Sequence, residues 1–499
     1  MMMSLRRGFG VGSAVAFAAL LSHSQCTDVP SNGTTNTDGL SGGSVDMAMV
    51  IPPQDPPSTL AITSVNPPRL AQDQATTLAI GGTGFKAGAT VTVGGVTCAG
   101  PIVSQVNFTG TLITCAIPTQ LKTCGLQNIV VTNPDATTVS NDQLFLRHPA
   151  APAYAPRASM AVGAQPDGIV VADVDGDGKQ DLVYAQRNSN NIAVRLGVGD
   201  GTFAAATTYG GGGSGPIELA VADFTGDNKL DIAVANSSGS VGVLINSGTG
   251  TFGAAKTVAV TSPHGLAVGD VNGDGKLDVV VSNQVTAANV FIGDGTGTLV
   301  AATPAAVGVG ANPLDLALGD VNGDGKLDML VTNFNDKTLS VRLGNGNGTF
   351  SNTNTVSTNA GPVGVAVADL NGDKNLDVVV ANQTAGNASI FFGDGTGGFA
   401  MPVTLTTGNG TRQVAIVDLN RDGLLDLAFT NSAGANVGIY LGNGQGTFAG
   451  FTGSTLFTVG NTPYGIATGD FNGDGNRDFV TTDFNGNTLS VMLATEQCK

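Results

Sequence analysis

The stretch Asp320-Val-Asn322-Gly-Asp324-Gly-Lys-Leu-Asp328 decides the fold that we expect for this chain. It carries oxygen-bearing side chains at positions 1, 3, 5 and 9 and glycine at positions 4 and 6. Seven such stretches follow one another, with starts about 49 residues apart. The other six begin at Asp173, Asp223, Asp270, Asp369, Asp418 and Asp470. A single fixed period predicts an architecture that repeats one structural unit.

The spacing of these oxygen-bearing side chains predicts a structural calcium site in each loop, up to seven Ca²⁺ in all. Side chains at positions 1, 3, 5 and 9 and the carbonyl at position 7 offer the hard oxygen ligands that Ca²⁺ takes. A solvated turn is the alternative for any single copy; seven copies filled alike favour metal. The predicted ligands are Asp173, Asp175, Asp177, Asp181, Asp223, Thr225, Asp227, Asp231, Asp270, Asn272, Asp274, Asp278, Asp320, Asn322, Asp324, Asp328, Asp369, Asn371, Asp373, Asp377, Asp418, Asn420, Asp422, Asp426, Asp470, Asn472, Asp474 and Asp478.

Three of the loops depart from the pattern. Thr225 stands at position 3 of the second loop, and Arg421 replaces glycine at position 4 of the sixth. Asn228 and Lys374 replace glycine at position 6, where a side chain disfavours the tight backbone path. We therefore expect weaker metal binding at the second, fifth and sixth loops.

Apolar runs flank every loop, so each loop is expected to join two β-strands. Each repeat then contains four strands. In the fifth repeat they are expected at about 363–370, 376–381, 388–393 and 403–408. Four short strands in seven copies predict a seven-bladed β-propeller. The seventh repeat ends after its third strand, and residues 157–162 are expected to supply the fourth, which would close the ring and remove two exposed sheet edges.

Composition and charge agree with this architecture. The 499 residues include 73 Gly, no Trp and only 12% charged residues, which is typical of many short strands joined by glycine turns. The net charge is −17, but 22 of the 38 acidic residues lie in the seven loops. Seven bound Ca²⁺ would leave about −3. Charge thus favours metal over nucleic acid, which requires a basic surface.

The N-terminal region predicts export. Residues 1–25 carry two arginines and then a short apolar run, the pattern of a secretory signal peptide. Residues 26–59 are rich in Ser, Asn, Thr, Gly and Pro and predict a disordered tether. Cys26 stands where a lipoprotein cysteine would, although the residues before it fit poorly. We expect a secreted or cell-surface protein that contacts a membrane only if Cys26 carries a lipid anchor, as in an outer-membrane lipoprotein.

Residues 60–147 predict a small β-sandwich, because short apolar runs alternate with turn signals such as Gly81-Gly82. The motifs Ile62-Thr-Ser-Val-Asn-Pro-Pro68 and Val93-Gly-Gly-Val-Thr-Cys98 resemble the IPT/TIG immunoglobulin-like domain. That resemblance implies a disulfide between Cys98 and Cys115 and a spacer or binding role. Cys124 and Cys498 have no assigned partner. A Pro- and Ala-rich hinge is expected at 148–156 and the propeller at 157–499.

Six of the seven repeats carry a second signature, the glycine turn Leu343-Gly-Asn-Gly-Asn-Gly-Thr-Phe350 between the third and fourth strands. Together with the Asp-rich loops, it resembles the FG-GAP/VCBS repeats, which include the calcium-loaded propeller of integrin alpha chains. The resemblance implies the propeller fold and bound calcium. It does not imply a single function, because the family includes adhesins, lectins and surface proteins of unknown role.

Strand order places the calcium loops and glycine turns on one face of the propeller and the more variable loops on the other. Ligands are expected at the variable face. The starts of the innermost strands there form a candidate ligand-binding ring: Asp167, Glu218, His264, Asp315, Arg412 and Tyr464. Ordinary channel-mouth residues in contact with water are the alternative interpretation of that ring.

The function that we expect is that of an exported, calcium-stabilised binding or adhesion module for an extracellular protein or glycan. A calcium-dependent lectin is the alternative, although no Trp and five Tyr offer few platforms for sugar rings. A carbohydrate-active enzyme is disfavoured. With three histidines, two of them at His23 and His148, no histidine-based site can be assembled, and we expect no enzymatic activity.

Overall fold

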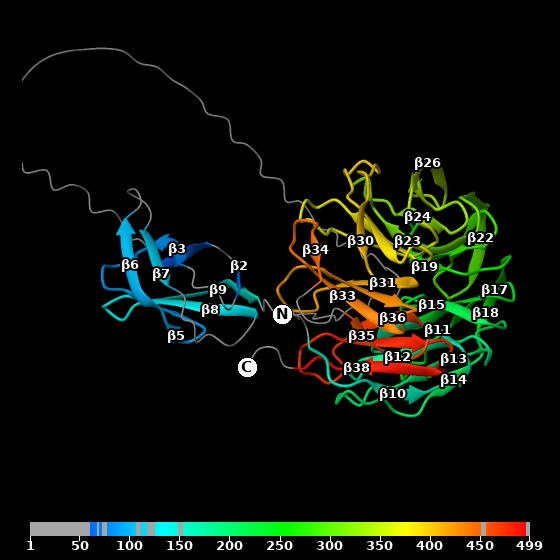
Figure 1. Ribbon diagram of the computed structural model, residues 1–499, viewed down its shortest axis with the longest axis horizontal. Coiled ribbons are helices and arrows are strands. Elements are labelled where there is room, and N and C mark those ends of the chain that lie inside the picture. The colour runs from blue at the N-terminus through cyan, green and yellow to red at the C-terminus, as the bar shows by residue number, and fades with distance from the viewer. Residues whose placement is uncertain are drawn as a thin grey trace, which may run out of the picture. The chain divides into compact units, whose positions relative to one another are not determined.

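The computed structural model describes residues 60–66, 69–71, 77–105, 111–116, 125–147, 153–450 and 456–495. The regular elements in these residues are all strands, which confirms the all-β prediction. They form two compact units, shown in Figure 1, and each unit is described by itself. The predicted signal peptide and tether, with Cys26, Cys124 and Cys498, lie outside the described residues. Among the described residues no helix has the length and apolar character needed to cross a bilayer.

The smaller unit is a sandwich of two sheets, ordered β1-β3-β7-β6 and β2-β9-β8-β4-β5. Every second side chain of β3 and β4 points into the core, so that Leu78, Ile80, Val91 and Val93 are fully buried. Cys98 is buried in the same core; its pairing with Cys115, whose side chain is not described, stays a prediction. The strands are β1 (Ala61–Asn66), β2 (Arg69–Ala71), β3 (Thr77–Thr83), β4 (Thr90–Val93), β5 (Val96–Thr97), β6 (Ala99–Gln105), β7 (Thr111–Ala116), β8 (Gly125–Thr132) and β9 (Thr138–Arg147).

In the larger unit, the strands within 153–450 and 456–495 form seven antiparallel sheets, which we number by the Asp-rich loop that each contains. The first four are β11 (Pro166–Ala172), β12 (Asp181–Gln186), β13 (Asn191–Arg195), β14 (Thr207–Tyr209); β15 (Pro216–Ala222), β16 (Asp231–Asn236), β17 (Ser240–Leu244), β18 (Lys256–Ala259); β19 (Leu266–Gly269), β20 (Asp278–Ser282), β21 (Ala287–Gly293), β22 (Leu299–Gly308); and β23 (Pro313–Gly319), β24 (Asp328–Asn333), β25 (Thr338–Gly344), β26 (Phe350–Ser357).

The last three sheets follow the same order, with the seventh completed from the start of the unit. They are β27 (Pro362–Ala368), β28 (Asp377–Asn382), β29 (Asn387–Phe391), β30 (Val403–Thr406); β31 (Thr411–Val417), β32 (Asp426–Asn431), β33 (Asn436–Gly442) with β34 (Phe448–Ala449) and β35 (Leu456–Thr458); and β36 (Pro463–Gly469), β37 (Asp478–Asp483), β38 (Thr488–Met492), β10 (Ala158–Ala161). The four strands expected in the fifth repeat agree with β27 to β30 within a few residues.

The seven sheets form a ring. The innermost strands β11, β15, β19, β23, β27, β31 and β36 each contact the next, and β36 contacts β11 again. Between each pair of neighbouring sheets lies a cluster of buried apolar side chains. Val171 and Tyr184 of the first sheet, for example, pack with Val480 of the seventh. This arrangement is a β-propeller, in which each sheet is stable only between its neighbours.

The ring closes as the sequence predicts. The N-terminal strand β10 pairs with β38, so that Ala158 lies opposite Val491 and Ala161 opposite Thr488; in Figure 1 they lie side by side in teal and red. The pairing extends further than expected, into the predicted hinge. The Ala155 N–H donates to the Leu493 carbonyl at 2.8 Å, and the Tyr154 ring packs edge-on against the ring of Phe479.

Side-chain hydroxyls join neighbouring sheets near the starts of the innermost strands. The Thr332 hydroxyl accepts the Asp315 N–H at 3.1 Å within its own sheet and donates to the Val363 carbonyl of the next sheet at 2.7 Å. Ser282, Thr430 and Thr482 make the same pair of bonds at the equivalent places. A hydroxyl suits this position because one group both accepts and donates.

We predict that Thr332→Val, which keeps the shape and removes the hydroxyl, lowers the free energy of unfolding by about 1 to 3 kcal/mol, since a buried N–H and a buried carbonyl lose a partner. Urea denaturation of the full chain measures the change. Thr257→Val, on the exposed face of β18, is the matched control and should change stability by less than about 0.5 kcal/mol. Equal stabilities of the two variants would show that the hydroxyl bridges do not stabilise the ring.

Candidate metal loops and the cavity at the channel mouth

The Asp-rich loops share one backbone conformation. In the fourth loop, Gly323 at position 4 has φ of +72° and Gly325 at position 6 has φ of +81°, in the left-handed region. The residues that replace glycine adopt the left-handed conformation as well, with φ of +59° at Arg421, +63° at Asn228 and +73° at Lys374. The loop path is therefore kept where glycine is missing, at the cost of a conformation that L side chains disfavour.

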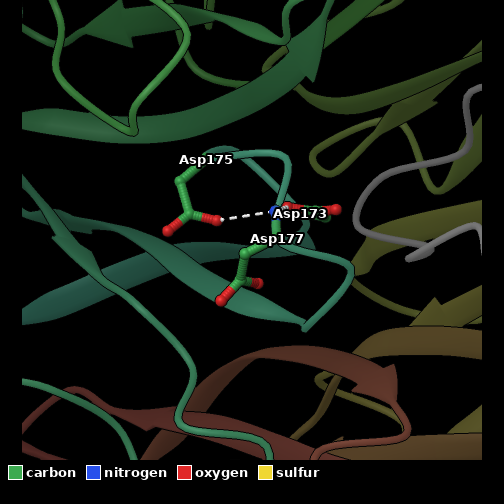
Figure 2. A group of neighbouring side chains, drawn as sticks. All are labelled: Asp173, Asp175 and Asp177. Atoms are coloured by element: carbon green, nitrogen blue, oxygen red, sulfur yellow. Dashed lines mark hydrogen bonds between the residues drawn. The ribbon is translucent and has the colours of Figure 1, made fainter.

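Hydrogen bonds from backbone N–H groups hold the loop carboxylates close together. In the first loop, Asp173 accepts the N–H groups of Gly176 at 2.7 Å and Gly178 at 2.9 Å, and Asp175 accepts that of Asp177 at 3.1 Å. Figure 2 shows the last of these bonds and the three carboxylates that it helps to hold together. One oxygen of each of Asp173, Asp175 and Asp177 lies within 4.8 Å of the others.

This arrangement suits a hard cation. Three carboxylates held this close repel one another, and burial together with the neighbouring carboxylates raises the pKa of Asp175. A cation with a preference for oxygen ligands would remove the repulsion, and the residues present fit Ca²⁺ in that respect. In the other six loops position 3 is an amide or a hydroxyl, which places less charge around the same centre.

Position 9 has a role that the sequence did not indicate. Asp181 is fully buried and accepts the Val174 N–H at 2.8 Å and the Gly197 N–H at 2.7 Å, so it ties its loop to the end of the third strand. The equivalent Asp makes the same two bonds in every loop. Among the described residues, the only three-membered group of possible metal-binding acids comprises positions 1, 3 and 5 of the first loop, without Asp181. The predicted closing ligand is thus first of all a backbone anchor.

Burial sets the protonation of these anchors. Desolvation raises the pKa of Asp181, Asp278 and Asp328 to about 6, of Asp478 to about 7 and of Asp426 to about 8. The nearby loop carboxylates add to the increase. Charge on these groups is therefore costly unless a cation lies near.

The third and seventh loops are also held by the next sheet. The Gly348 N–H of the fourth sheet's glycine turn donates to the Val271 carbonyl in the third loop at 2.9 Å. The Gly201 N–H donates in the same way to Phe471 in the seventh loop at 2.9 Å. The glycine turns therefore connect these two loops to the neighbouring blade.

We predict that Arg421→Gly raises the free energy of unfolding by about 0.5 to 1 kcal/mol. Relief of the left-handed Arg is worth about 1 to 2 kcal/mol, partly offset by the greater freedom of Gly in the unfolded chain. Chemical denaturation in excess calcium measures the change. The matched control is Gly473→Ala, at the same position of the seventh loop, which should lower stability. A loss of stability in Arg421→Gly would contradict the argument.

The predicted ligand-binding ring is found at the other end of the innermost strands. These strands separate it from the loops by roughly 20 Å, at about 3.3 Å per residue. One small cavity, of about 30 Å³, is lined by all six predicted residues: Asp167, Glu218, His264, Asp315, Arg412 and Tyr464. Six of the seven sheets thus contribute one of these side chains each, and Gln413 and several backbone segments complete the lining.

At one position of these strand starts, that of Gly168 in the first sheet, glycine and a polar side chain alternate from the first sheet to the seventh. A Cβ at Gly265 would lie 2.5 Å from the Leu314 carbonyl oxygen, and one at Gly364 would lie 2.6 Å from that of Arg412. Glycine is therefore required where neighbouring innermost strands approach most closely. The polar residues Glu218, Asp315 and Gln413 follow Gly168, Gly265 and Gly364 in the ring and occupy the space that these glycines leave.

Arg412 is held by stacking. Its guanidinium carbon lies 3.5 Å from the centroid of the Tyr464 ring, and Tyr464 stacks in turn on Phe484 at 4.2 Å with an angle of 23°. Arg412 Nη2 lies 3.9 Å from Asp167 Oδ1, and Arg187 Nη1 lies 3.5 Å from Asp167 Oδ2. Sequence reasoning missed Arg187 and Phe484. Both stand one residue beyond the end of a second strand, a register position that would have indicated them.

Burial also sets protonation in the cavity. Desolvation, with the nearby positive charge of Arg412, lowers the pKa of His264 to about 3, so the ring is neutral. Its Nδ1 lies 3.1 Å from the Leu314 carbonyl, which can only accept, so the proton is on Nδ1. Desolvation raises the pKa of Asp167, although Arg412 and Arg187 act to lower it. Desolvation also raises the pKa of Asp315 to about 6.

We predict that charge on Asp315 costs stability. Burial raises the pKa of Asp315. The N–H groups of Val365 and Leu316, the Gln413 side chain and the charge of Arg412 lower it, but by less. The folded state thus holds the proton more tightly than the unfolded state, and its favourable contribution is lost as pH rises through about 6. Relative to Asp315→Asn, wild-type stability should fall by about 2 to 3 kcal/mol between pH 4 and pH 7. Urea denaturation in excess calcium tests this, and a difference independent of pH would contradict it.

Comparison with known families agrees with the repeats and the sandwich. A family model described as FG-GAP-like repeat matches residues 173–234, 223–281, 270–331, 320–380, 369–429 and 419–481. A second, the IPT/TIG domain, matches residues 60–146. No curated protein sequence matches the chain.

Solved structures resemble the chain in fold alone. BBS1N, solved in complex with ARL6DN, is 14% identical, with a TM-score of 0.50 over 70% of this chain and 98% of that one. The periplasmic gluconolactonase PpgL of Pseudomonas aeruginosa is 15% identical, with a TM-score of 0.48 over 68% of this chain and 96% of that one. At such identities neither protein's partner or activity can be transferred to this chain.

Proposed function

The chain belongs to the FG-GAP-like repeat family, and on this premise we propose that it is an exported binding or adhesion module whose propeller is stabilised by calcium. The observation that supports this function is the convergence of six polar or aromatic side chains, from six sheets, on one cavity at the channel mouth. A repeated scaffold that places different side chains at equivalent positions is how propellers present a recognition surface.

Calcium has a structural role in this proposal. The loops lie about 20 Å from the cavity, so a bound ion would not contact a ligand there. Ca²⁺ would neutralise the gathered carboxylates of loops such as that of Asp173, Asp175 and Asp177, and would rigidify turns that brace the neighbouring blade. The export segment at 1–25 and the Cys98–Cys115 disulfide belong to the same proposal, since disulfides persist in an oxidising exterior; a lipid anchor at Cys26 is the alternative to free secretion.

A carbohydrate-active enzyme is the second candidate. The observation in its favour is the raised pKa of Asp167 and Asp315 in one cavity, since perturbed acids mark active sites. Two observations weigh against it. Asp167 is paired with Arg187 and lies near Arg412, and the cavity is small, at about 30 Å³. We therefore favour binding over catalysis.

The calcium part of the proposal predicts a large fall in the melting temperature of the full chain on addition of a chelator. Excess Ca²⁺ should restore it and Mg²⁺ should not, because Mg²⁺ demands a tighter octahedral site. Differential scanning calorimetry of chelated, Ca²⁺-loaded and Mg²⁺-loaded protein measures the effect. A melting temperature indifferent to chelator would mean that the loops are solvated turns.

The binding part is tested with labelled full-length chain on a panel of extracellular matrix proteins and polysaccharides. Arg412→Glu should abolish whatever binding the wild-type chain shows. Lys256→Glu, on the exposed outer strand β18, is the matched charge reversal and should leave binding intact. Binding that survives Arg412→Glu would place the recognition surface elsewhere.

A further inference from the structure

The channel-mouth cavity contains hydrogen-bond donors without acceptors. The Arg412 side chain is only 14% exposed, yet within the described residues its guanidinium makes no hydrogen bond; Asp167 Oδ1, at 3.9 Å, is too far for one. The stack on Tyr464 and Phe484 fixes the guanidinium and occupies its face. Its N–H edge is therefore held in place and available to a ligand.

The same cavity contains acceptors without donors. Asp167 Oδ2 is buried and makes no hydrogen bond, although Arg187 Nη1 lies 3.5 Å away. His264 uses Nδ1–H for the Leu314 carbonyl, which leaves Nε2 with a lone pair and, in the part of the chain described, no donor. A buried polar atom without a hydrogen bond is costly, so Asp167 Oδ2 marks a place where a ligand would gain one, and His264 Nε2 can accept another.

The charges around the cavity disfavour an ionic ligand. Asp167, Glu218, Asp315 and Arg412 line it, and Arg187 lies 3.5 Å from Asp167. An anion would have to approach three carboxyl groups, and a cation would have to approach two arginines. A neutral group can accept a hydrogen bond from Arg412 and donate hydrogen bonds to Asp167 and His264. It is repelled neither by the carboxyl groups nor by the arginines.

The size of the cavity and its aromatic residue restrict how a ligand enters. About 30 Å³ accommodates the edge of a sugar ring but not the whole ring. Tyr464 offers no platform, because Arg412 covers one face and Phe484 stacks on the other. Recognition here would rest on hydrogen bonds alone.

The surrounding face favours a polyhydroxyl ligand over a protein. Of the large apolar side chains that are exposed in the described residues, Val285 alone lies on a loop of this face; Val198, Val300, Met401, Val403 and Leu456 lie on outer strands or on the opposite turns. Protein interfaces are anchored by apolar and aromatic side chains near their centre. Among the described residues of this face, Tyr464 lies at the channel mouth, but its ring is already stacked between Arg412 and Phe484.

We infer that the channel-mouth cavity binds two neighbouring hydroxyl groups at the edge of a neutral glycan, with Arg412 donating to one hydroxyl oxygen and Asp167 and His264 accepting from the hydroxyl protons. The inference rests on the proposed function and specifies its ligand class. It differs from recognition through calcium, because the loops are at the other end of the strands.

The test is a glycan array that contains neutral, carboxylated and sulfated sugars, probed with full-length chain in excess Ca²⁺. The wild-type chain should bind neutral glycans in preference. Arg412→Gln and Asp167→Asn should each weaken the apparent Kd about tenfold or more, the effect of one lost hydrogen bond to a charged group. Lys337→Gln, which removes an exposed positive charge from a loop of the same face, is the matched control and should bind as the wild type does.

Melting temperatures of all variants establish that they fold. If Arg412→Gln does not fold, Arg412→Lys keeps the charge and loses the planar fork, and it should still weaken binding several-fold. No binding to neutral glycans, a preference for acidic ones, or unchanged affinity in both Arg412→Gln and Asp167→Asn overturns the inference.

The same measurements separate this inference from the proposed function. Suppose that a defined matrix protein binds the wild-type chain and not Arg412→Glu, while the glycan array shows no binding. The proposed binding function would then stand, and the inference that the ligand is a glycan would be wrong. Glycan binding could also disappear with chelator at a temperature where the protein stays folded, and be unchanged in Arg412→Gln. That result would indicate recognition at the Asp-rich loops and would show that the cavity is not the binding site.

Discussion

The fold depends on a buried carboxylate that ends each Asp-rich loop. Asp328 and its six equivalents accept one N–H from their own loop and one from the end of the third strand. These two bonds fix the turn between the first and second strands, and with it the position of the innermost strand. The cavity lies at the other end of the same strands. A constraint on one face of the propeller therefore sets the geometry of the opposite face.

Much of this could be predicted because it is local or periodic. Oxygen-bearing side chains at fixed spacing identify the loop, and the 49-residue period identifies the propeller. Strand direction then brings residues such as Asp167 and Arg412, far apart in sequence, to one channel mouth. The absence of a fourth strand after β38 indicated that β10 closes the ring, which the pairing confirms. None of these steps required a side-chain contact to be known in advance.

What could not be predicted depends on contacts across the ring. Arg187 and Phe484 lie in loops without a motif, and they acquire a role only because their blades place them beside Asp167 and Tyr464. The position-9 Asp was assigned to metal because its spacing suits a ligand; spacing cannot show that both oxygens already accept backbone N–H groups. Pairing at Tyr154 was missed because a Pro- and Ala-rich stretch is typical of a linker.

The Asp-rich loops and the cavity lie at opposite ends of the innermost strands. This separation explains how the loops can be alike in every repeat while the residues that line the cavity differ from blade to blade. Residues that anchor the loops recur in every blade, because each blade must meet the same neighbour in the same way. At the channel mouth six of the seven blades contribute a polar or aromatic side chain to the cavity, so a change there alters the cavity lining and leaves the apolar clusters between the blades in place. The hydroxyl bridge at Thr332 and the close approach at Gly265 hold the strand starts in place. The cavity lining can then vary on a scaffold that is held at both ends of its innermost strands.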